Sequence, residues 1–363
     1  MLELIQNEGK FYSMRDDWNR LLEKSGVDNP YLTHEWLSSW WKAYKDEKEL
    51  IIVNFRDQGR IIGAIPLFLS KEMIFGVPIK VINFFADHWG SMDLILTEKK
   101  AECVAEFFSW FHSSKIADVL ILSRIPEVSE NASIIEQAVM NRKLNYKKTR
   151  LKNTVILLQG SWDDYLKQLT KKFRYEIKNK QKKLLGLGNV KYERITEVED
   201  ADKILPALRA VGVKSWKYKD KKGIAVSNQG WQFYRNIISE WGRAKKLDIS
   251  ILKQNDRPIA FAVRVKHKET CYALETAYDQ DYYVYSPGLV VNSVLLERLF
   301  EENSVKKYEL GQVNESKNRW SQNCSPELKF NIYNKTNKIR FLLQLKKIKD
   351  IISGKNKTKY KGL

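Results

Sequence analysis

The sequence is poor in cysteine and holds no arrangement of residues typical of a metal site. Only Cys103, Cys271 and Cys324 occur among the 363 residues, and they are far apart, without CxxC spacing. This excludes a disulfide-stapled scaffold or a zinc ribbon and favours a reducing compartment. The histidines have no metal-ligand partners at suitable spacing, so no metal is expected.

Long hydrophobic runs are missing as well. The longest apolar stretch covers residues 61–69 and contains Pro66, which makes it about half as long as a span of the bilayer requires. The first eight residues are acidic and lack the basic and apolar regions of a secretory signal. We therefore expect a soluble, cytoplasmic protein.

Several motifs with a known mechanism are absent. The sequence contains no GxGxxG, no GxxxxGK[ST] and no GxSxG, which disfavours a dinucleotide-binding domain, a P-loop and a hydrolase with a nucleophile elbow.

The composition is that of a globular protein with an excess of positive charge. Hydrophobic residues make up 43% and charged residues 29%, and 63 Lys and Arg stand against 44 Asp and Glu. The length predicts about two domains. The net charge of +19 predicts attraction to phosphates, acidic glycans or anionic lipid headgroups without selecting among them.

Helices and strands are mixed in the first half of the chain. Thr33 can cap a helix whose aromatic residues recur at helical spacing up to Tyr44. Residues 49–55 and 60–69 predict a hairpin that turns at 57–59. Further strands are predicted at 79–85, 92–96 and 117–123, and further helices at 99–113 and 132–144.

The second half begins with a strand at 154–158 and a basic amphipathic helix. Ser161 is the predicted cap, the apolar stripe runs on to Ile177, and the helix ends at residues 186–188. Helices are also predicted at 200–214 and 232–243. Three strand patterns follow at 247–252, 259–266 and 270–278, joined by short polar turns, and these predict an antiparallel meander.

The meander leads into the turn Tyr285-Ser286-Pro287-Gly288, then an apolar helix at 289–300 and a strand at 308–310. The start of such a helix presents unpaired N–H groups and the positive end of the helix dipole, which together favour a phosphate. Pro287 suits the first position of a helix, and Gly288 leaves room for a ligand. Pro-Gly before a helix is also common in turns that bind no ligand.

The order of these elements resembles the GNAT acyltransferase fold, in which the turn after the fourth strand binds the pyrophosphate of acyl-coenzyme A. A series of short motifs is similar, more narrowly, to the CelD/FemAB-like branch. These motifs are Pro30-Tyr31-Leu32 with Trp36, Phe173-Arg174, Tyr278-Asp279, Tyr285-Ser286-Pro287-Gly288, Tyr308-Glu309-Leu310-Gly311 and Glu315-Ser316-Lys317-Asn318-Arg319-Trp320. Ser316 and Glu309 depart from the branch pattern, which usually has an aromatic residue and an Asp there.

The resemblance implies an α/β (α+β) fold of two GNAT-like units, each a mixed, mostly antiparallel central sheet flanked by helices. Residues 1–150 would form a degenerate unit on the acceptor side, and residues 151–333 the unit that binds acetyl-CoA or another acyl-CoA as co-substrate. It also implies an N-acyltransferase acting on an amino sugar or another cell-envelope or exopolysaccharide component, with a glycan or lipid-linked amine as acceptor.

Site residues follow from this resemblance and from the local patterns. The acyl-CoA would be held by Ser286, Pro287, Gly288, Leu289 and Val290. Strand alternation places Glu275 on one face with Cys271, Ala273 and Ala277, where its carboxylate could deprotonate the amine of the acceptor. Alternatively, Glu275 is a solvated strand residue paired with a neighbouring Lys or Arg. Lys317 would lie near the acceptor and bind a phosphate or stabilise the negative charge that develops in the reaction. Alternatively, it is an exposed surface lysine. Tyr285 or Tyr308 could protonate the thiolate.

Contacts with the acceptor are expected from further residues. His88 and Asp87 lie in a polar turn that could face the cleft between the units, or only satisfy turn hydrogen bonds. Arg174, Trp216 and Arg319 are the other predicted substrate contacts, and Arg319 would also orient its own segment.

The chain ends in a strongly basic segment, and two other functions remain open. Residues 334–363 carry ten Lys or Arg against Asp350, with Phe341, Leu345, Ile348 and Ile352 at the spacing of an amphipathic helix. Such a helix could dock on an anionic membrane surface or pack on the domain. One alternative function is a FemX-like aminoacyl transfer from charged tRNA to a peptidoglycan precursor, the only role foreseen for nucleic acid. The other is a non-catalytic scaffold on the membrane surface.

Overall fold

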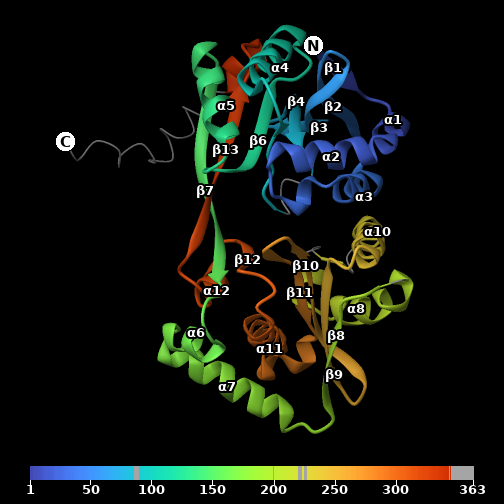
Figure 1. Cartoon of the computed structure of the whole chain (residues 1–363), viewed down its shortest axis with the longest axis vertical. Helices are drawn as coiled ribbons and strands as arrows, with labels where there is room; N and C mark the ends of the chain where they lie inside the picture. Colours follow the sequence, from blue (N-terminus) through green and yellow to red (C-terminus); the bar gives the residue numbers. More distant parts are fainter. Residues whose placement is uncertain (86–89, 199, 220–222, 225–226, 343, 345–363) are drawn as a thin grey trace, which may run out of the picture.

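The computed structural model describes residues 1–85, 90–198, 200–219, 223–224, 227–342 and 344. Figure 1 shows two units joined along the strands β7 and β13. The elements of the first unit are β1 (Leu2–Ile5), α1 (Glu8–Ser13), α2 (Arg15–Ser25), η1 (Pro30–Leu32), α3 (His34–Tyr44), β2 (Lys48–Asp57), β3 (Arg60–Ile74), β4 (Val77–Phe84), β5 (Ile95–Leu96), α4 (Lys100–Ser114), β6 (Val119–Pro126), α5 (Glu130–Asn141) and β7 (Asn145–Leu157).

The second unit continues from β7. Its elements are α6 (Trp162–Gln168), α7 (Lys171–Leu185), β8 (Val190–Ile195), η2 (Ala201–Lys203), α8 (Leu205–Gly212), α9 (Trp216–Lys219), α10 (Asn228–Arg243), β9 (Leu247–Gln254), β10 (Arg257–His267), β11 (Thr270–Tyr278), η3 (Gln280–Tyr285), α11 (Pro287–Glu302), β12 (Lys307–Gln312), α12 (Glu315–Asn318) and β13 (Cys324–Tyr333).

One mixed, mostly antiparallel sheet runs through both units. Its order is β1-β2-β3-β4-β6-β13-β7-β12-β11-β10-β9-β8, with β5 attached to β3. The pairs β4–β6 and β11–β12 are parallel. The predicted fold class is confirmed.

The two units repeat one arrangement. Strands β2, β3 and β4 form an antiparallel meander, α4 follows, and β6 returns parallel to β4. Strands β9, β10 and β11, helix α11 and strand β12 follow the same order. The predicted hairpin and meander are therefore present, and the second half repeats the first in topology.

The units exchange strands where they meet. Strand β13, at the end of the second unit, lies between β6 and β7 and is antiparallel to both. Strand β7 pairs with β13 over most of its length and with β12 near its carboxyl end. Strand β7 also crosses the proposed boundary at residue 150, so neither unit completes its part of the sheet alone.

Helices α3 and α10 bring the two units together on one face of this sheet. The ring of Trp36 on α3 stacks on Trp241 of α10, with centroids 5.0 Å apart, and meets Phe233 edge-on. All three side chains are buried. Burial of such large rings stabilises the contact between the units.

The prediction of one continuous helix after Ser161 is wrong, because the chain forms two helices there, α6 and α7. Leu169 is extended (φ −75°, ψ 158°) and ends α6. Thr170 then caps α7 by accepting a hydrogen bond from the N–H of Phe173 at 3.3 Å. The apolar stripe continues across the break, so hydrophobic periodicity alone could not reveal it. The helix predicted at 200–214 is likewise divided, into η2 and α8.

Only the beginning of the basic carboxyl-terminal segment belongs to the described residues. Ile339 and Leu342 are buried against Ile79, Val81 and Val119, whereas Phe341 is 50% exposed. Residue 343 and residues 345–363 lie outside the description, so the amphipathic helix predicted there stays a prediction. No helix in the described part of the chain has the length and apolar character needed to cross a membrane.

The role of β13 in the first unit can be tested at Phe330, which is fully buried and pairs with Leu122 of β6. We expect Phe330→Ala to lower the free energy of unfolding by about 3–5 kcal/mol, because the lost ring leaves a cavity. Urea denaturation measures the change. Met140→Ala, at a side chain that is 59% exposed, is the control and should stay within about 0.5 kcal/mol of wild type. Equal effects of the two variants would contradict the assigned role.

Candidate active site

Strands β11 and β12 separate soon after they begin. Only Thr270, Cys271 and Tyr272 pair with Lys307–Glu309, although β11 continues to Tyr278. The gap opens into a cavity of about 880 Å³, which we call the central cavity. Among its lining residues are Arg124, Phe173, Trp216, Lys217, Ala273, Glu275, Thr276, Tyr278, Ser286, Gly288, Leu289, Asn292, Tyr308, Gly311, Lys317 and Arg319.

A β-bulge in β11 corrects the predicted orientation of Glu275. Val263 of β10 pairs with Glu275, but the next residue, Arg264, pairs with Ala273, which leaves Leu274 as the extra residue. The bulge reverses the alternation of faces. Glu275 therefore faces the same side as its partner Val263 in the main core, whereas Ala273 packs against the core beside α11.

The carboxylate of Glu275 is buried and held by the backbone. The N–H of Ile224 donates to both carboxylate oxygens, at 3.3 and 3.1 Å, and Lys217 Nζ lies 3.8 Å from Oε1. A Cβ at Gly223 would come within 2.2 Å of the same carboxylate. Glu275 thus lines the central cavity in a defined orientation and is not the solvated strand residue of the alternative prediction.

Helix α11 offers fewer free N–H groups than its sequence predicts. Ser286 precedes it in the left-handed conformation (φ 50°), and its carbonyl accepts the N–H groups of Leu289 and Val290 at 2.9 and 3.2 Å. The N–H of Gly288 has no acceptor among the described residues. A Cβ on Gly288 would lie 3.2 Å from the ring of Tyr278, so this position is already closely packed.

A buried arginine lies beneath the α11 side of the cavity. Arg264 is fully buried and donates to three neutral acceptors, the hydroxyl of Tyr308 (3.1 Å), Ser250 Oγ (3.0 Å) and Asn292 Oδ1 (3.2 Å). Asn292 in turn donates to the carbonyl of Gly288 at 2.7 Å. Tyr308, whose oxygen accepts from Arg264, keeps its own proton available for donation into the cavity.

Lys317 reaches the cavity from α12. Its Nζ donates to the carbonyl of Gln312 at 3.0 Å. Burial lowers the pKa of Lys317 to about 8, and the positive charges of Arg124 and Lys217 act in the same direction. This is not the behaviour of an ordinary exposed surface lysine.

Glu309 is a titratable group whose role sequence reasoning did not anticipate. Burial raises its pKa to about 7, and the nearby Glu327 contributes in the same direction. Asn153 holds both carboxylates, with its Nδ2 3.1 Å from Glu309 and 2.7 Å from Glu327. The only signal in the sequence for an unusual group at position 309 was that Glu replaces the Asp typical of the CelD/FemAB-like branch. Its partners Asn153 and Glu327 lie on other strands, so no local pattern links them to it.

The other predicted site residues are distributed differently. Trp216 and Arg319 line the central cavity, and the Arg319 guanidinium lies over Phe173, 4.1 Å from the ring centre, and pairs with Glu176. Arg174 caps the carboxyl end of α6 by donating to carbonyls that include that of Lys167, at 2.7 Å. Tyr285, Pro287 and Val290 lie near the cavity without lining it. His88 and Asp87 fall outside the described residues.

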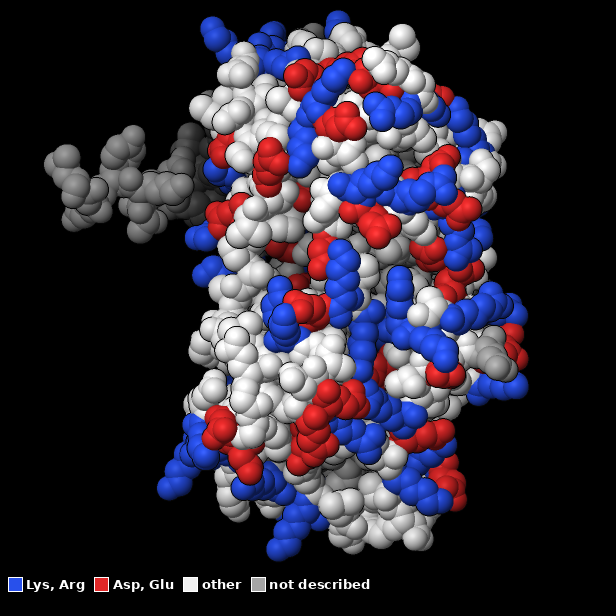
Figure 2. All heavy atoms as spheres, viewed as in Figure 1, with Lys and Arg blue, Asp and Glu red and all other residues white. Residues whose placement is uncertain are grey.

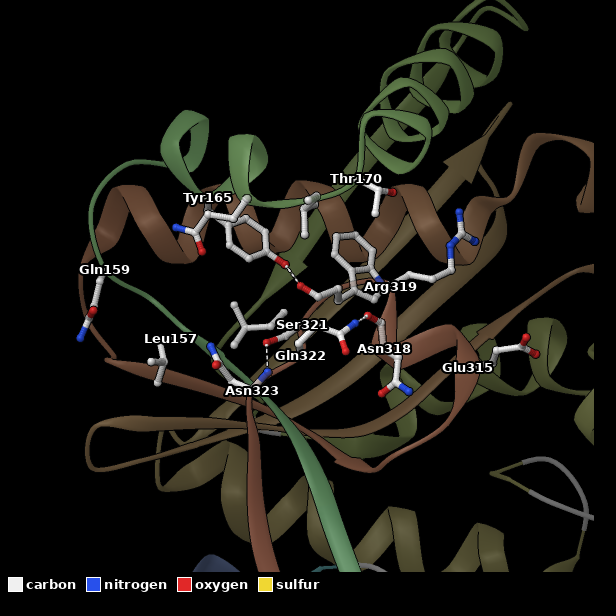
Figure 3. A pocket seen from close by; sticks show the side chains of 14 residues that line it. Leu157, Gln159, Tyr165, Thr170, Glu315, Asn318, Arg319, Ser321, Gln322 and Asn323 are labelled. Atoms are coloured by element: carbon white, nitrogen blue, oxygen red, sulfur yellow. Dashed lines mark hydrogen bonds between the residues drawn. The ribbon is translucent and has the colours of Figure 1, made fainter.

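A second hollow of about 560 Å³ lies beside the central cavity and shares Arg319 and Trp320 with it. Figure 3 shows amide side chains around this hollow, among them Gln159, Asn318 and Asn323. Tyr165 donates its hydroxyl to the carbonyl of Trp320 at 2.7 Å, which ties α6 to the segment after α12. No group of three or more His, Cys, Asp or Glu in the described residues could hold a metal ion.

Residues 171–320 match the family model described as acetyltransferase (GNAT) domain. The fold is similar to that of FemX (10% identity, 94% of this chain and 99% of that chain covered, TM-score 0.58). It is also similar to the C-terminal domain of a putative lysylphosphatidylglycerol synthetase from Agrobacterium fabrum (11% identity, 95% of this chain and 97% of that chain covered, TM-score 0.57). A third similar structure is L-PGS from Bacillus licheniformis (12% identity, 92% of this chain and 95% of that chain covered, TM-score 0.54). These identities show a shared fold alone. No curated protein sequence matches the chain.

The raised pKa of Glu309 predicts a pH-dependent stability. A carboxyl whose pKa rises from 4.5 in the unfolded chain to about 7 in the fold stabilises the protein fully below pH 4.5 and loses that contribution as the pH rises through 7. We expect Glu309→Gln to gain about 1–3 kcal/mol relative to wild type between pH 5 and pH 8. Urea denaturation at both pH values measures the gain.

The exposed Glu23 provides the control for this measurement. Glu23→Gln should show no such pH-dependent gain relative to wild type. A Glu309→Gln variant whose stability relative to wild type is the same at both pH values would contradict the assignment.

Proposed function

Since residues 171–320 form an acetyltransferase domain of the GNAT family, we propose that the chain is an acyl-CoA-dependent N-acyltransferase. Acetyl-CoA is the first donor to test. The proposed acceptor is an amine of an amino sugar or of another cell-envelope or exopolysaccharide component. The observation that carries this proposal is the opening between β11 and β12, because it joins the start of α11 to a buried carboxylate in one cavity.

The residues around the opening suit an acyl-CoA. The facing edges of β11 and β12 leave backbone groups without a partner strand beyond Tyr272, and the pantetheine arm of coenzyme A carries amides that can bond to them. Ala273 and Gly311 leave space along this path, and Leu289 provides an apolar wall. The free N–H of Gly288 and the positive end of α11 suit the diphosphate. When bound, the co-substrate supplies a thioester carbonyl.

The chain's own residues would then move two protons. Glu275 accepts a proton from the ammonium of the acceptor, directly or through a water, so that the neutral amine can attack the carbonyl carbon. Attack forms the carbon–nitrogen bond, and the nitrogen releases its second proton to water as the amide forms. The carbon–sulfur bond breaks, and Tyr308, held by Arg264, donates its proton to the leaving thiolate and regains one from water. Lys317 lies on the acceptor side, where it stabilises negative charge. Of the two tyrosines considered for this role, the scheme uses Tyr308 and not Tyr285, because Tyr308 lines the cavity.

One observation favours a second function, a FemX-like aminoacyl transfer from charged tRNA. The fold is similar to that of FemX, and the exposed side of α7 could provide a track for RNA. The exposed lysines of α7 are Lys171, Lys172, Lys178, Lys182 and Lys183. Stabilisation by tRNA without stabilisation by coenzyme A would select this alternative. The family assignment favours either enzyme over a non-catalytic scaffold.

The donor site can be tested at Gly288. We expect coenzyme A at saturating concentration to raise the melting temperature of wild type by several degrees, as a ligand specific to the folded state does. Gly288→Val should abolish this shift, because its side chain projects beside Tyr278 at the start of α11. Gly186→Val, at the end of α7 where a Cβ has room at 3.4 Å, is the control. An unchanged shift in Gly288→Val would contradict the donor site.

The role of Glu275 predicts a different kind of loss. We expect Glu275→Gln to lower kcat by about 10²–10⁴-fold, the usual contribution of a general base, and to leave the coenzyme A shift unchanged. Release of free thiol from acetyl-CoA with an amino-sugar acceptor measures the rate. Full activity of Glu275→Gln would remove it from the mechanism.

A further inference from the structure

Arg124 reaches the active site from the other unit and does so from a strained backbone. Between Leu122 and Ile125, β6 has two residues opposite the single residue Lys329 of β13, so a bulge lies at Arg124. Its φ of 66° is in the left-handed region, which is costly for a residue with a side chain. Bulges of this kind redirect a side chain, and this one places Arg124 in the lining of the central cavity.

The guanidinium of Arg124 is only partly used by the protein. The residue is 5% exposed, and its Nη2 lies 2.9 Å from Asn153 Oδ1 and 3.4 Å from Glu327 Oε2. Its buried Nε has no hydrogen-bond partner within the described residues. Because an arginine has five N–H donors in a planar fork, this side chain keeps donor capacity beside the cavity.

Two lysines, Lys217 and Lys317, bring further positive charge to the same cavity, which they both line. The three cations interact, since the charges of Arg124 and Lys217 both lower the pKa of Lys317. Lys317 makes no ion pair with a described carboxylate, and its Nζ donates to a backbone carbonyl instead. Figure 2 shows Lys and Arg gathered across the middle of the visible face.

The carboxylates near this group do not fully balance it. Glu275 lies 3.8 Å from Lys217, and Glu327 lies 3.4 Å from Arg124. Glu309 is close enough to influence Lys317 but is about half protonated near pH 7. Positive charge therefore remains at neutral pH, and a bound anion would relieve the repulsion among the three cations.

Lys217 lies on the acceptor side and not on the donor side, and its charge and that of Arg124 both act on Lys317. Lys217 approaches Glu275, which faces the main core. The start of α11 packs on the opposite face of the sheet, where Val290 and Val291 meet Ala260 and Ala262. Lys217 and the place proposed for the diphosphate of acyl-CoA are thus on opposite faces of the sheet.

We propose that Arg124, Lys217 and Lys317 bind an anionic group, a phosphate or a carboxylate, carried by the acyl acceptor. This inference rests on the proposed function, since it names the chemical class of that acceptor. The degenerate first unit would then set substrate specificity, because it supplies Arg124. A bidentate guanidinium contact supported by two ammonium groups is a strong arrangement for either anion.

Three amino sugars test the proposal by calorimetry with coenzyme A present: glucosamine 6-phosphate, muramic acid and glucosamine. We expect at least one of the two anionic sugars to bind tenfold or more tightly than glucosamine. A preference for glucosamine 6-phosphate identifies a phosphate site, and a preference for muramic acid identifies a carboxylate site. Glucosamine binding as tightly as both, or no binding by any of the three, overturns the proposal.

Variants assign the preference to the named residues. Arg124→Gln and Lys317→Gln should each reduce it at least fivefold, and Lys147→Gln, at an exposed lysine of β7, should leave it unchanged. Lys317 is partly exposed, so its variant keeps the test valid if Arg124→Gln does not fold, which circular dichroism will show. An undiminished preference in Lys317→Gln and in any folded Arg124 variant overturns the assignment.

The thermal shift with coenzyme A, measured in parallel, separates this inference from the proposed function. A normal shift with no preference for anionic sugars overturns the anion site alone. A preference for anionic sugars without any coenzyme A shift overturns the acyl-CoA donor and leaves the anion site in place.

Discussion

The separation of β11 from β12 is the constraint on which the rest of the active site depends. Two parallel strands that pair over three residues and then part leave backbone donors and acceptors facing each other across a gap. Buried groups of this kind need partners, so the gap is stable only where water or a ligand reaches it. The central cavity supplies that access, and it carries the start of α11 at one side of the sheet and Glu275 at the other.

The bulge at Leu274 gives these two sides separate tasks. Without it, Glu275 would face α11 together with Ala273, on the side proposed for the donor. With it, the carboxylate faces the main core, where Ile224 and Lys217 of the second unit hold it. One extra residue in a strand thus places the carboxylate of Glu275 on the face opposite α11, while Ala273 stays on the α11 side.

The exchange of β7 and β13 explains how residues from both units come to share one site. Because β13 lies between β6 and β7, Glu327 is beside Arg124 of β6 and within reach of Asn153 of β7. Glu309 of β12 completes this buried polar group from the far side of β7. Such groups are stable only when their members satisfy one another, so the polar group restricts how the two units can pack. The first unit thereby contributes Arg124 to the lining of the central cavity.

Local signals in the sequence were enough for most of the elements and for the start of α11. The hairpin, the meander and the Ser-Pro-Gly turn depend on alternation and on turn residues, which act over a few positions. The break between α6 and α7 did not follow from periodicity, since Thr170 interrupts the backbone and not the apolar stripe. The face of Glu275 did not follow either, because a bulge is specified by the partner strand as well as by the strand that contains it.

By itself, therefore, the sequence determined the kinds of elements, their order and the residues at the start of α11. Tertiary structure alone decided which side chains share the central cavity. Arg124 in the cavity lining, and Glu309 and Glu327 close to it, belong to the three strands β6, β12 and β13, and no spacing rule relates them. Their unusual environments arise from burial and mutual charge, and these exist only once the two halves of the sheet are joined.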